Sequence, residues 1–302
     1  MQKYLVFFVF FFYFGFNYAD GAVHPVIPYH VPDAEIQPLA ELIDPALQKK
    51  LEDRLRKNKY WASLLLRKKM AVGLVDISDS LHIKFARING DEMMYAASLP
   101  KIAILLAAYQ SFADHSLTPT AQITNDLRFM ISKSDNAAAT RVIDLLGFKK
   151  IQSVLTDQRY MLYDKNRGGG LWVGKRYAKI GLRYPDPMRG LSHAATVTQI
   201  CRFYYLLVMG KLVSYEFSQE MLDMLSDPEL HHKFVNTLDR IAPSAKLYRK
   251  SGTWKNYHSD SVLVWGQGWR RYIATAMVED IRGEIILQEL IIAIEEALKD
   301  HS

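Results

Sequence analysis

Segments with the alternating pattern of β-strands stand at both ends of this 302-residue chain, far apart in sequence. Near the start, an apolar run at 71–77 is followed by alternating apolar residues at 81–85;. Near the end, the strand-like segments are 247–253, 261–265 and 271–278. Neither end has enough strands for a stable sheet of its own. We therefore expect one sheet that is assembled from both ends of the chain.

The long stretch between these strand groups is mostly helical in pattern. From Ser98 to about Tyr215, apolar residues recur at helical spacing, most clearly over 99–112, 136–146 and 196–207;. The sequence therefore predicts an α/β fold with a helical lobe inserted between the strands.

Two further helices accompany the strand segments. Asp44 followed by Pro45 supplies an N-cap and a first-turn proline, which predicts a helix to about Lys57;. The last helix is amphipathic, with apolar residues recurring over 285–298;. The predicted catalytic unit thus covers residues 44–302.

The N-terminus has the plan of a secretory signal peptide. Lys3 precedes an unbroken apolar stretch over 4–16, and small and polar residues follow;. A spanning helix needs about 17 to 25 apolar residues, which is more than this stretch offers. We expect residues 1–21 to be removed by cleavage after Ala19 or Gly21, which leaves no stable membrane span and an exported protein.

Residues 22–43 differ in character from the rest of the chain. They lack sustained periodicity, which suits an arm laid over the surface, outside the core. Their four prolines are Pro25, Pro28, Pro32 and Pro38.

The cysteine count and the charge distribution argue against a disulfide-stabilised fold and a nucleic-acid-binding protein. The only cysteine is Cys201, so an exported fold of this sequence is not held by disulfides;. Cys201 lies in an apolar helical pattern, which favours a buried small hydrophobe. The net charge of +6 is spread along the chain, without a basic tract;. No nucleic-acid partner is indicated.

Ser98 and Lys101 stand where the strand region gives way to the strongest helical pattern. Spacing i, i+3 places both side chains on one helix face, and Pro100 fits a first turn. Lysine works as a general base only when neutral, and both a helix N-terminus and burial lower its pKa. The pattern favours Ser98 as a nucleophile with Lys101 as its base.

A Ser-x-x-Lys pattern alone arises by chance about once in a chain of this length. Here two further motifs accompany it. Ser-Asp-Asn occupies 134–136, 36 residues after Ser98, and Lys-Ser-Gly occupies 250–252. Class A β-lactamases and penicillin-binding proteins have this three-part signature, with threonine where the third motif of this chain has Ser251;. From about Leu47 to its end, the chain resembles these serine hydrolases.

The resemblance implies a β-lactamase-like sandwich, with one antiparallel sheet flanked by helices and an inserted helical lobe. It also implies the chemical roles of the first two motifs. Ser98 attacks an amide or ester carbonyl, Lys101 accepts its proton, and Ser134 passes a proton to the leaving nitrogen. Asp135 is better suited to a structural cap or loop brace than to catalysis.

Substrate-binding roles follow from the same resemblance. Asn136 holds the substrate's side-chain amide, and Lys250 and Ser251 bind its carboxylate. The backbone N–H groups of Ser98 and Thr253 form the oxyanion hole. No cofactor or metal is implied. The expected partner is a small β-lactam or peptide-like molecule, and the expected location is the bacterial periplasm or the exterior.

The sequence departs from the class A pattern at one point. A class A β-lactamase uses a glutamate, between the second and third motifs, to activate the deacylating water. This chain has no glutamate between Glu92 and Glu216. The corresponding region over 164–181 is glycine-rich and basic, and Asp164 is its only acid. Asp164 is a candidate substitute, although its side chain is shorter.

Several functions therefore stay open. The chain is a serine hydrolase that β-lactams acylate at Ser98, with slow turnover or another water-activating group. Alternatively, it is a peptidase or esterase of the same fold that acts on cell-wall peptide, with Lys101 serving both steps. A third hypothesis is a binding module or sensor that is acylated without turnover. A fourth is a relative of the serine-dependent glutaminases, which also use a Ser-x-x-Lys motif.

Three histidines are candidate site residues. His231 and His232 suit a surface turn or pocket wall better than a metal site. His193 precedes the helix that starts near Thr196 and is a candidate for lining the site.

Overall fold

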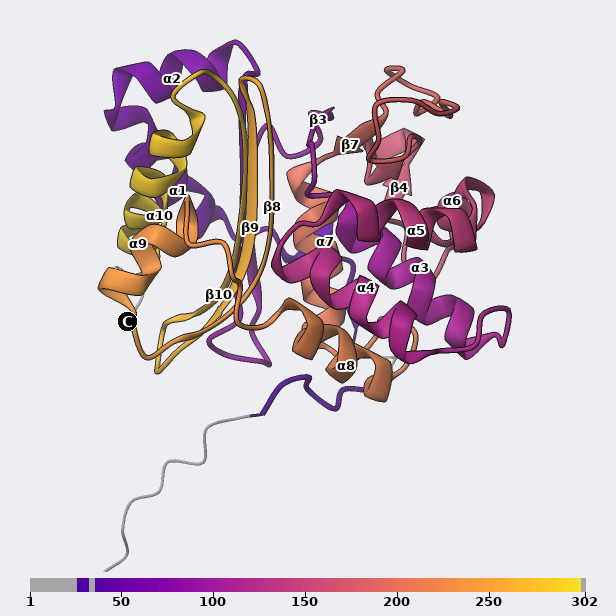
Figure 1. Ribbon diagram of the computed structural model, residues 1–302. Coiled ribbons are helices and arrows are strands. Elements are labelled where there is room, and N and C mark those ends of the chain that lie inside the picture. Colours follow the sequence, from indigo (N-terminus) through magenta and orange to yellow (C-terminus); the bar gives the residue numbers. More distant parts are fainter. Residues whose placement is uncertain (1–25, 33–35, 300–302) are drawn as a thin grey trace, which may run out of the picture.

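The computed structural model describes residues 26–32 and 36–299, and its centre is a five-stranded antiparallel sheet (Figure 1). The strand order is β2-β1-β10-β9-β8. The strands are β1 (Met70–Asp76), β2 (Lys84–Ile88), β8 (Lys246–Trp254), β9 (Tyr257–Trp265) and β10 (Arg271–Glu279). In the middle of the sheet, β1 pairs with β10, so Val72 lies opposite Ala276. The prediction of one sheet built from both chain ends is confirmed.

One face of the sheet is covered by helices from the two ends of the chain (Figure 1). These helices are α1 (Pro45–Lys57), α2 (Lys59–Leu66), α9 (Phe234–Ile241) and α10 (Gly283–Lys299). The predicted cap of α1 is present, since the Asp44 carboxylate accepts a hydrogen bond from Leu47 N at 2.7 Å. Leu47, Leu51 and Leu55 are fully buried on the sheet-facing side of α1.

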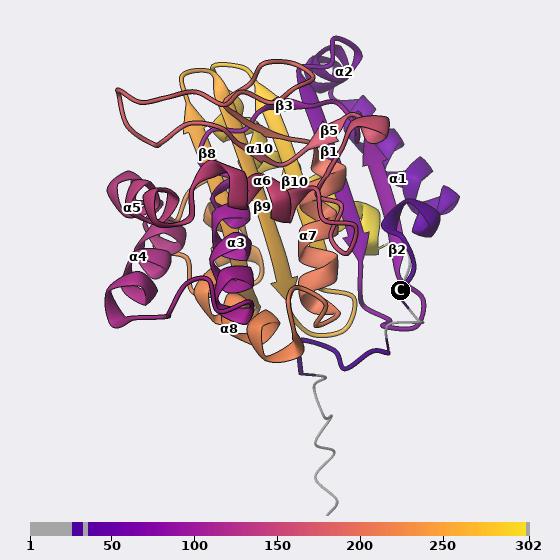
Figure 2. The same cartoon turned by 90° about the vertical axis from the view of Figure 1, so that its right-hand side faces the viewer.

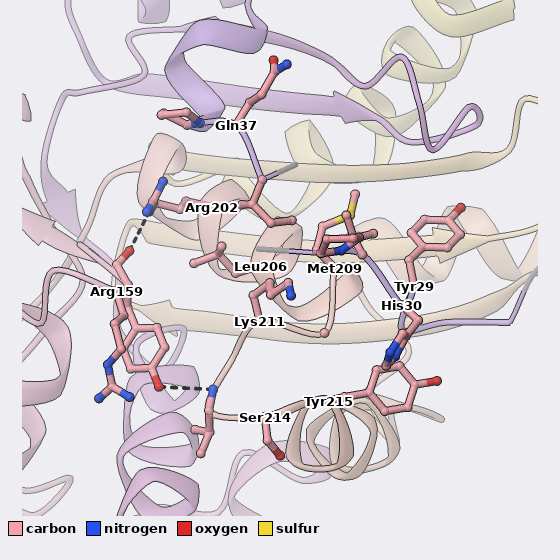
Figure 3. A pocket seen from close by; sticks show the side chains of 17 residues that line it. Tyr29, His30, Gln37, Arg159, Arg202, Leu206, Met209, Lys211, Ser214 and Tyr215 are labelled. Carbon is pink, nitrogen blue, oxygen red and sulfur yellow. Dashed lines mark hydrogen bonds between the residues drawn. The ribbon is translucent and has the colours of Figure 1, made fainter. Parts of the chain in front are cut away.

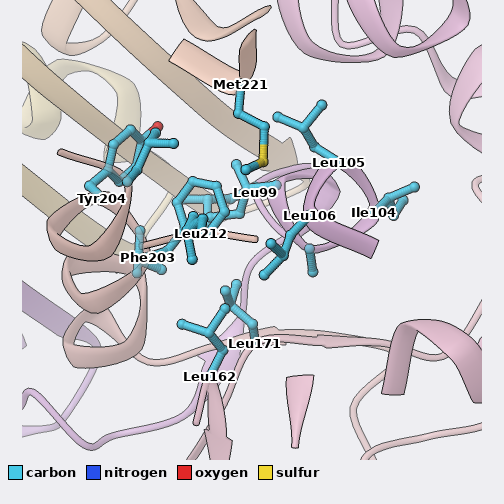
Figure 4. Close-up of a cluster of buried hydrophobic side chains, with 14 of the residues drawn as sticks. Leu99, Ile104, Leu105, Leu106, Leu162, Leu171, Phe203, Tyr204, Leu212 and Met221 are labelled. Atoms are coloured by element: carbon cyan, nitrogen blue, oxygen red, sulfur yellow. The ribbon is translucent and has the colours of Figure 1, made fainter. Parts of the chain in front are cut away.

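The helical lobe lies on the opposite face (Figure 2). It contains α3 (Lys101–Ala113), α4 (Ala121–Ser132), α5 (Asn136–Leu146), α6 (Phe148–Leu155), α7 (Val197–Val208) and α8 (Tyr215–Leu225). Residues 101–112 of α3 are all buried, so α3 is the central helix of the lobe. Leu99, Leu106, Phe203 and Met221 meet in the core around it (Figure 4). The predicted helices over 136–146 and 196–207 are confirmed as α5 and α7.

Helix α7 also joins the lobe to the sheet. It contacts β1 and β10. A Cβ at Gly73 in β1 would lie 2.7 Å from Cys201 Sγ, so the close approach depends on glycine. Cys201 is buried as expected, and this burial raises the pKa of its thiol to about 12;.

Short strands and loops accompany the helices of the lobe, with β3 before α3 and the others between α6 and α7. The strands β3 (Met94–Tyr95), β6 (Trp172–Val173) and β7 (His193–Ala195) form a small sheet. The pair β4 (Tyr163–Asp164) and β5 (Gly169–Gly170) flanks the turn η3 (Lys165–Arg167). A long loop, residues 174–192, connects β6 to β7 and stands above the lobe at the upper right of Figure 1.

The arm over 22–43 corrects one expectation. Its described part lies along the protein, and Tyr29 N donates to Val208 O at 2.6 Å. Ile27 and Leu39 are buried members of the core, and Leu39 begins the turn η2 (Leu39–Leu42). The prolines interrupt periodicity without preventing apolar side chains from being buried. Residues 1–21, the predicted signal peptide, lie outside the described residues.

A hollow of about 790 Å³ opens beneath this arm (Figure 3). Tyr29, Arg202 and Lys211 are among the residues that line it. Tyr160 braces its wall, because its carbonyl accepts from Arg202 Nε at 2.6 Å and its hydroxyl from Val213 N at 3.2 Å.

The predicted strand around 81–85 is shorter than its alternation suggested. Strand β2 begins at Lys84, and Leu81 is 82% exposed. The Asp79 carboxylate accepts from Leu81 N at 2.9 Å and contacts His82 Nδ1 at 2.7 Å. These local bonds hold a turn where the apolar pattern favoured a strand. Within the two described ranges, no helix has the length and apolar character needed to cross a membrane.

Candidate active site

Ser98 lies in the turn between β3 and α3, on the wall of a cavity of about 790 Å³. Pro100 occupies the N-cap of α3, so the helix begins at Lys101, three residues beyond the position of the serine. Ala97, just before the serine, has φ +51°, in the left-handed region that residues with a side chain rarely adopt;. The chain thus turns sharply before the helix and presents Ser98 to the cavity.

Lys101 is completely buried beneath this wall. Its Nζ donates to Ser134 O at 2.6 Å, to Asn136 Oδ1 at 2.8 Å and to Ser134 Oγ at 3.3 Å. Burial lowers the pKa of Lys101 to about 7, against a smaller opposing effect of the Asp135 charge;. A large fraction of Lys101 is therefore neutral near pH 7, as a general base must be.

Ser134 lies between two lysines. Its hydroxyl accepts from Lys250 Nζ at 2.9 Å as well as from Lys101. The backbone at Ser134 has φ +58°, and the next residue, Asp135, caps α5 by accepting from Ala138 N at 2.6 Å. The predicted structural role of Asp135 is confirmed, and the cap fixes the turn that aims Ser134 at both lysines.

The third motif lies on β8, the edge strand that faces the helical lobe. Lys250 is buried, and its Nζ also donates to Ser251 O at 2.7 Å. Burial, followed by repulsion from Lys101, holds the pKa of Lys250 well below its usual range;. Ser251 is buried behind the strand, whereas Thr253 is exposed on the cavity wall.

Gly252 brings β8 directly against the turn that carries Ser98. A Cβ at this position would lie 2.4 Å from Ala96 O and 2.6 Å from Ser98 N. Only glycine allows this approach, because both neighbours are backbone atoms. The neighbouring Thr253 is thereby held beside Ser98, as an oxyanion hole made from their two N–H groups requires.

The structure also shows a buried ionic support behind β8 that the sequence motifs did not indicate. Arg249 binds Asp260 of β9 through two bonds, Nε–Oδ1 at 2.7 Å and Nη2–Oδ2 at 2.9 Å. Lys233 is fully buried and donates to Gly252 O at 2.6 Å and Ser259 O at 3.0 Å. No clear signal was present in the sequence, since Asp260 stands among the polar residues His258, Ser259 and Ser261 of β9. These bonds hold the carbonyl side of β8 in place.

Tyr177, on the loop over 174–192, was missed by the sequence motifs. Its ring lies 4.5 Å from Lys101 Nζ, and its hydroxyl donates to Ala97 O at 3.2 Å. Burial raises the pKa of Tyr177 well above its usual range, so the phenol stays neutral;. The side chain closes the cavity side of Lys101 and braces the turn that carries Ser98.

His193 of β7 packs on this tyrosine, with ring centroids 4.3 Å apart. Its Nε2 contacts Lys175 O at 3.0 Å. Burial lowers the pKa of His193 to about 4, so the imidazole is neutral at pH 7;. The structure therefore places His193 on the cavity wall, as a support for Tyr177 and its loop.

Asp164, the candidate for the missing acid, lies elsewhere. Its carboxylate accepts from Asn166 N at 2.9 Å and caps η3. It lines a separate hollow of about 490 Å³, together with Lys165 and Trp172. Within residues 26–32 and 36–299, no aspartate or glutamate lines the cavity that contains Ser98. The geometry therefore gives Asp164 no position from which to activate water at Ser98.

The fold and this cluster define an α/β protein in which Ser134 lies between two buried lysines, Lys101 and Lys250, at the junction of a sheet and a helical lobe. A family model described as "Beta-lactamase enzyme family" matches residues 125–301, more than half of the chain. The chain belongs to this family. The matched segment includes the second and third motifs and begins after Ser98. A comparison with curated proteins by sequence found no match.

Solved structures show the same fold. A β-lactamase from Sphaerobacter thermophilus matches with a TM-score of 0.61 at 16% identity, covering 82% of this chain and 95% of that chain. PBP-A matches with a TM-score of 0.61 at 17% identity, covering 91% of this chain and 100% of that chain. A mutant of PBP-A, solved as an acyl-enzyme complex with penicillin G, matches with a TM-score of 0.61 at 19% identity, covering 84% and 96%.

Proposed function

We propose that this protein is an exported serine hydrolase that β-lactams or related amides acylate at Ser98, and that it releases the acyl group slowly. The hydroxyl of Ser134, which accepts from both Lys101 and Lys250, carries the proposal. Such an arrangement can move a proton from the nucleophile to a leaving group. The solved PBP-A complex with penicillin G supports the choice of substrate class.

Acylation begins with proton transfer from Ser98 to the neutral amine of Lys101, while Ser98 Oγ forms a bond to the substrate carbonyl carbon. The oxyanion is stabilised by the N–H groups of Ser98 and Thr253. The C–N bond then breaks, and Ser134 donates its proton to the leaving nitrogen. Ser134 regains a proton from the ammonium of Lys101, so protons and bonds balance.

Substrate orientation uses the remaining motif residues. Asn136 Oδ1 is occupied by Lys101, so its Nδ2 is the end that donates to a substrate carbonyl;. The amine of Lys250 donates to Ser134 Oγ and is assigned the substrate carboxylate at β8, whose approach favours the protonated form of that amine;.

Slow release follows from what the cavity offers for water activation. No acid of the described chain lines it, His193 has a pKa of about 4, and Tyr177 stays neutral. Lys101, the base of the proposed mechanism, is covered by the ring of Tyr177. The protein therefore behaves as a penicillin-binding protein more than as an efficient β-lactamase. Activity as a peptidase or esterase, with Lys101 serving both steps, is the second candidate function.

The test is intact-mass measurement over time after mixing the protein with a penicillin and, separately, a cephalosporin. We expect an adduct that persists, that is absent in Ser98→Ala, and that forms normally in Ser192→Ala. Ser192 is a matched control because it is another serine on the same cavity wall.

Two other outcomes contradict the proposal in different ways. The absence of an adduct with every β-lactam would overturn acylation and favour the esterase function. An adduct that clears quickly with accumulation of hydrolysed product would overturn slow release and indicate a β-lactamase.

A further inference from the structure

Basic side chains gather on one wall of the Ser98 cavity. Four positively charged residues of the loop over 174–192 line the cavity. They are Lys175, Arg176, Lys179 and Arg183. Lys175 and Arg183 form an isolated β-bridge, so the two branches of the loop lie side by side. The lining has no carboxylate among the residues that the structure describes.

These four cations differ in what neutralises them. Arg176 Nε contacts Asp144 Oδ1 at 2.5 Å, so its charge is paired. In the described part of the chain, Lys175, Lys179 and Arg183 have no carboxylate within 4.0 Å, and Lys175 Nζ makes only a 3.5 Å contact to Lys179 O. Lys179 and Arg183 are exposed. Three positive charges thus face the cavity without a counter-charge from the described residues.

The electrostatic effect of these cations reaches into the cavity wall. After burial, the positive groups that lower the pKa of His193 are Lys101, Lys175 and Arg183. The backbone hydrogen bond to Lys175 acts in the opposite direction. The cavity therefore has a positive potential that concentrates anions near Ser98.

The loop borders the part of the site where the acyl portion of a substrate lies. Tyr177, on this loop, contacts Lys101, and Asn136, which the mechanism assigns to the substrate's side-chain amide, contacts Lys101 as well. The carboxylate assigned to Lys250 belongs to the other end of the substrate, at β8.

We propose that the loop over 174–192 forms a subsite for a second acidic group, carried on the acyl side chain of the substrate. The favoured substrate class is then an amide with a carboxylate in its acyl side chain, such as an acidic peptide. This inference rests on the proposed function, because it assumes acylation at Ser98.

Three penicillins that differ at one side-chain carbon test the inference. Benzylpenicillin is neutral at this carbon, carbenicillin has a carboxylate there, and ampicillin has an ammonium group. The second-order rate of acylation at Ser98 is measured for each. We expect carbenicillin to react about tenfold faster than benzylpenicillin, ampicillin to react more slowly than both, and added salt to reduce the differences.

Variants then locate the subsite. Lys179→Gln and Arg183→Gln should each lower the carbenicillin-to-benzylpenicillin rate ratio by about two- to fivefold. Lys49→Gln is the control, since it removes the same charge from an exposed residue of α1, on the face of the sheet opposite to the helical lobe. It should leave the ratio unchanged.

The outcomes separate the two proposals. Equal rates for the three penicillins, or an equal change of the ratio in the Lys49→Gln control, would overturn the subsite and leave acylation intact. If no penicillin forms an adduct at Ser98, the proposed function itself fails.

Discussion

The two walls of the cavity differ in construction. On the wall formed by α3, α5 and β8, Lys101, Ser134 and Lys250 lie in one hydrogen-bonded cluster, and both lysines are buried. On the facing wall, the loop over 174–192 offers exposed cations and no acid among the described residues. In the proposed function, the first wall is preorganised for forming an acyl-enzyme. The second wall would attract and cover the substrate, and its described residues supply no carboxylate that would activate water for release.

The largest expected effect is that of pH on the rate of acylation, through the buried Lys101. The pKa of Lys101 is lowered to about 7, and in the proposed mechanism its neutral form is the base. The second-order rate of acylation should therefore rise with pH through about 7 and fall about fiftyfold from pH 7 to pH 5, because the amine becomes protonated. Stopped-flow measurement with one penicillin checks this.

The control for this prediction is His193→Gln, because His193 is the other titratable group beside Tyr177. The variant should keep the midpoint near pH 7. A midpoint near pH 4, or one that disappears in His193→Gln, would show that Lys101 is not the base.

The next largest effect on the rate of acylation is expected at the contact between β8 and the turn that carries Ser98. In Gly252→Ala, the new Cβ would collide with Ala96 O and Ser98 N, so the strand or the turn must move. We expect acylation to slow by about ten- to a hundredfold, since displacements near 1 Å cost this much. Gly266→Ala is the control, because its nearest neighbour is Arg270 Cβ at 3.0 Å. Normal acylation by Gly252→Ala would refute the tight contact.

A smaller effect is expected where the loop touches the buried wall. Tyr177→Phe removes the bond to Ala97 O and keeps the ring over Lys101, so acylation should slow by about two- to tenfold;. Tyr177→Ala should instead open Lys101 to water, raise its pKa and move the midpoint of the pH profile upward. Identical pH profiles for the two variants would argue against the covering role of the ring.

The smallest effect is expected at Asp164. Its carboxylate caps η3 and lines a different hollow, so Asp164→Asn should leave the lifetime of the acyl-enzyme unchanged. The same intact-mass time course measures this lifetime. A markedly longer lifetime in the variant would mean that Asp164 reaches the acyl group after all and that the two walls cooperate in release.

Local patterns predicted much of the fold because each depends on neighbouring residues. The Asp44 cap, the helix over 136–146 with Gly147 at its end, and the sheet from both chain ends follow from capping, periodicity and alternation. The prediction of a strand near Leu81 was wrong. The Asp79 carboxylate holds a turn there, and the alternation of apolar residues does not reveal that bond.

The candidate site could be predicted only in part. The three motifs identified Ser98, Lys101, Ser134 and Lys250, since their residue types and order carry the chemistry. Tyr177 belongs to no motif, and its position over Lys101 arises where a loop folds back on a distant helix.

The sequence by itself determined which residues could serve as nucleophile, base and proton donor, and it showed that no glutamate stands between Glu92 and Glu216. The tertiary structure decided that the pKa of buried Lys101 is lowered to about 7, that Asp164 lies in another hollow, and that cations with no carboxylate partner in the described chain face the cavity. The physical reason is that burial and charge pairing depend on segments distant in sequence, and only the folded chain brings these together.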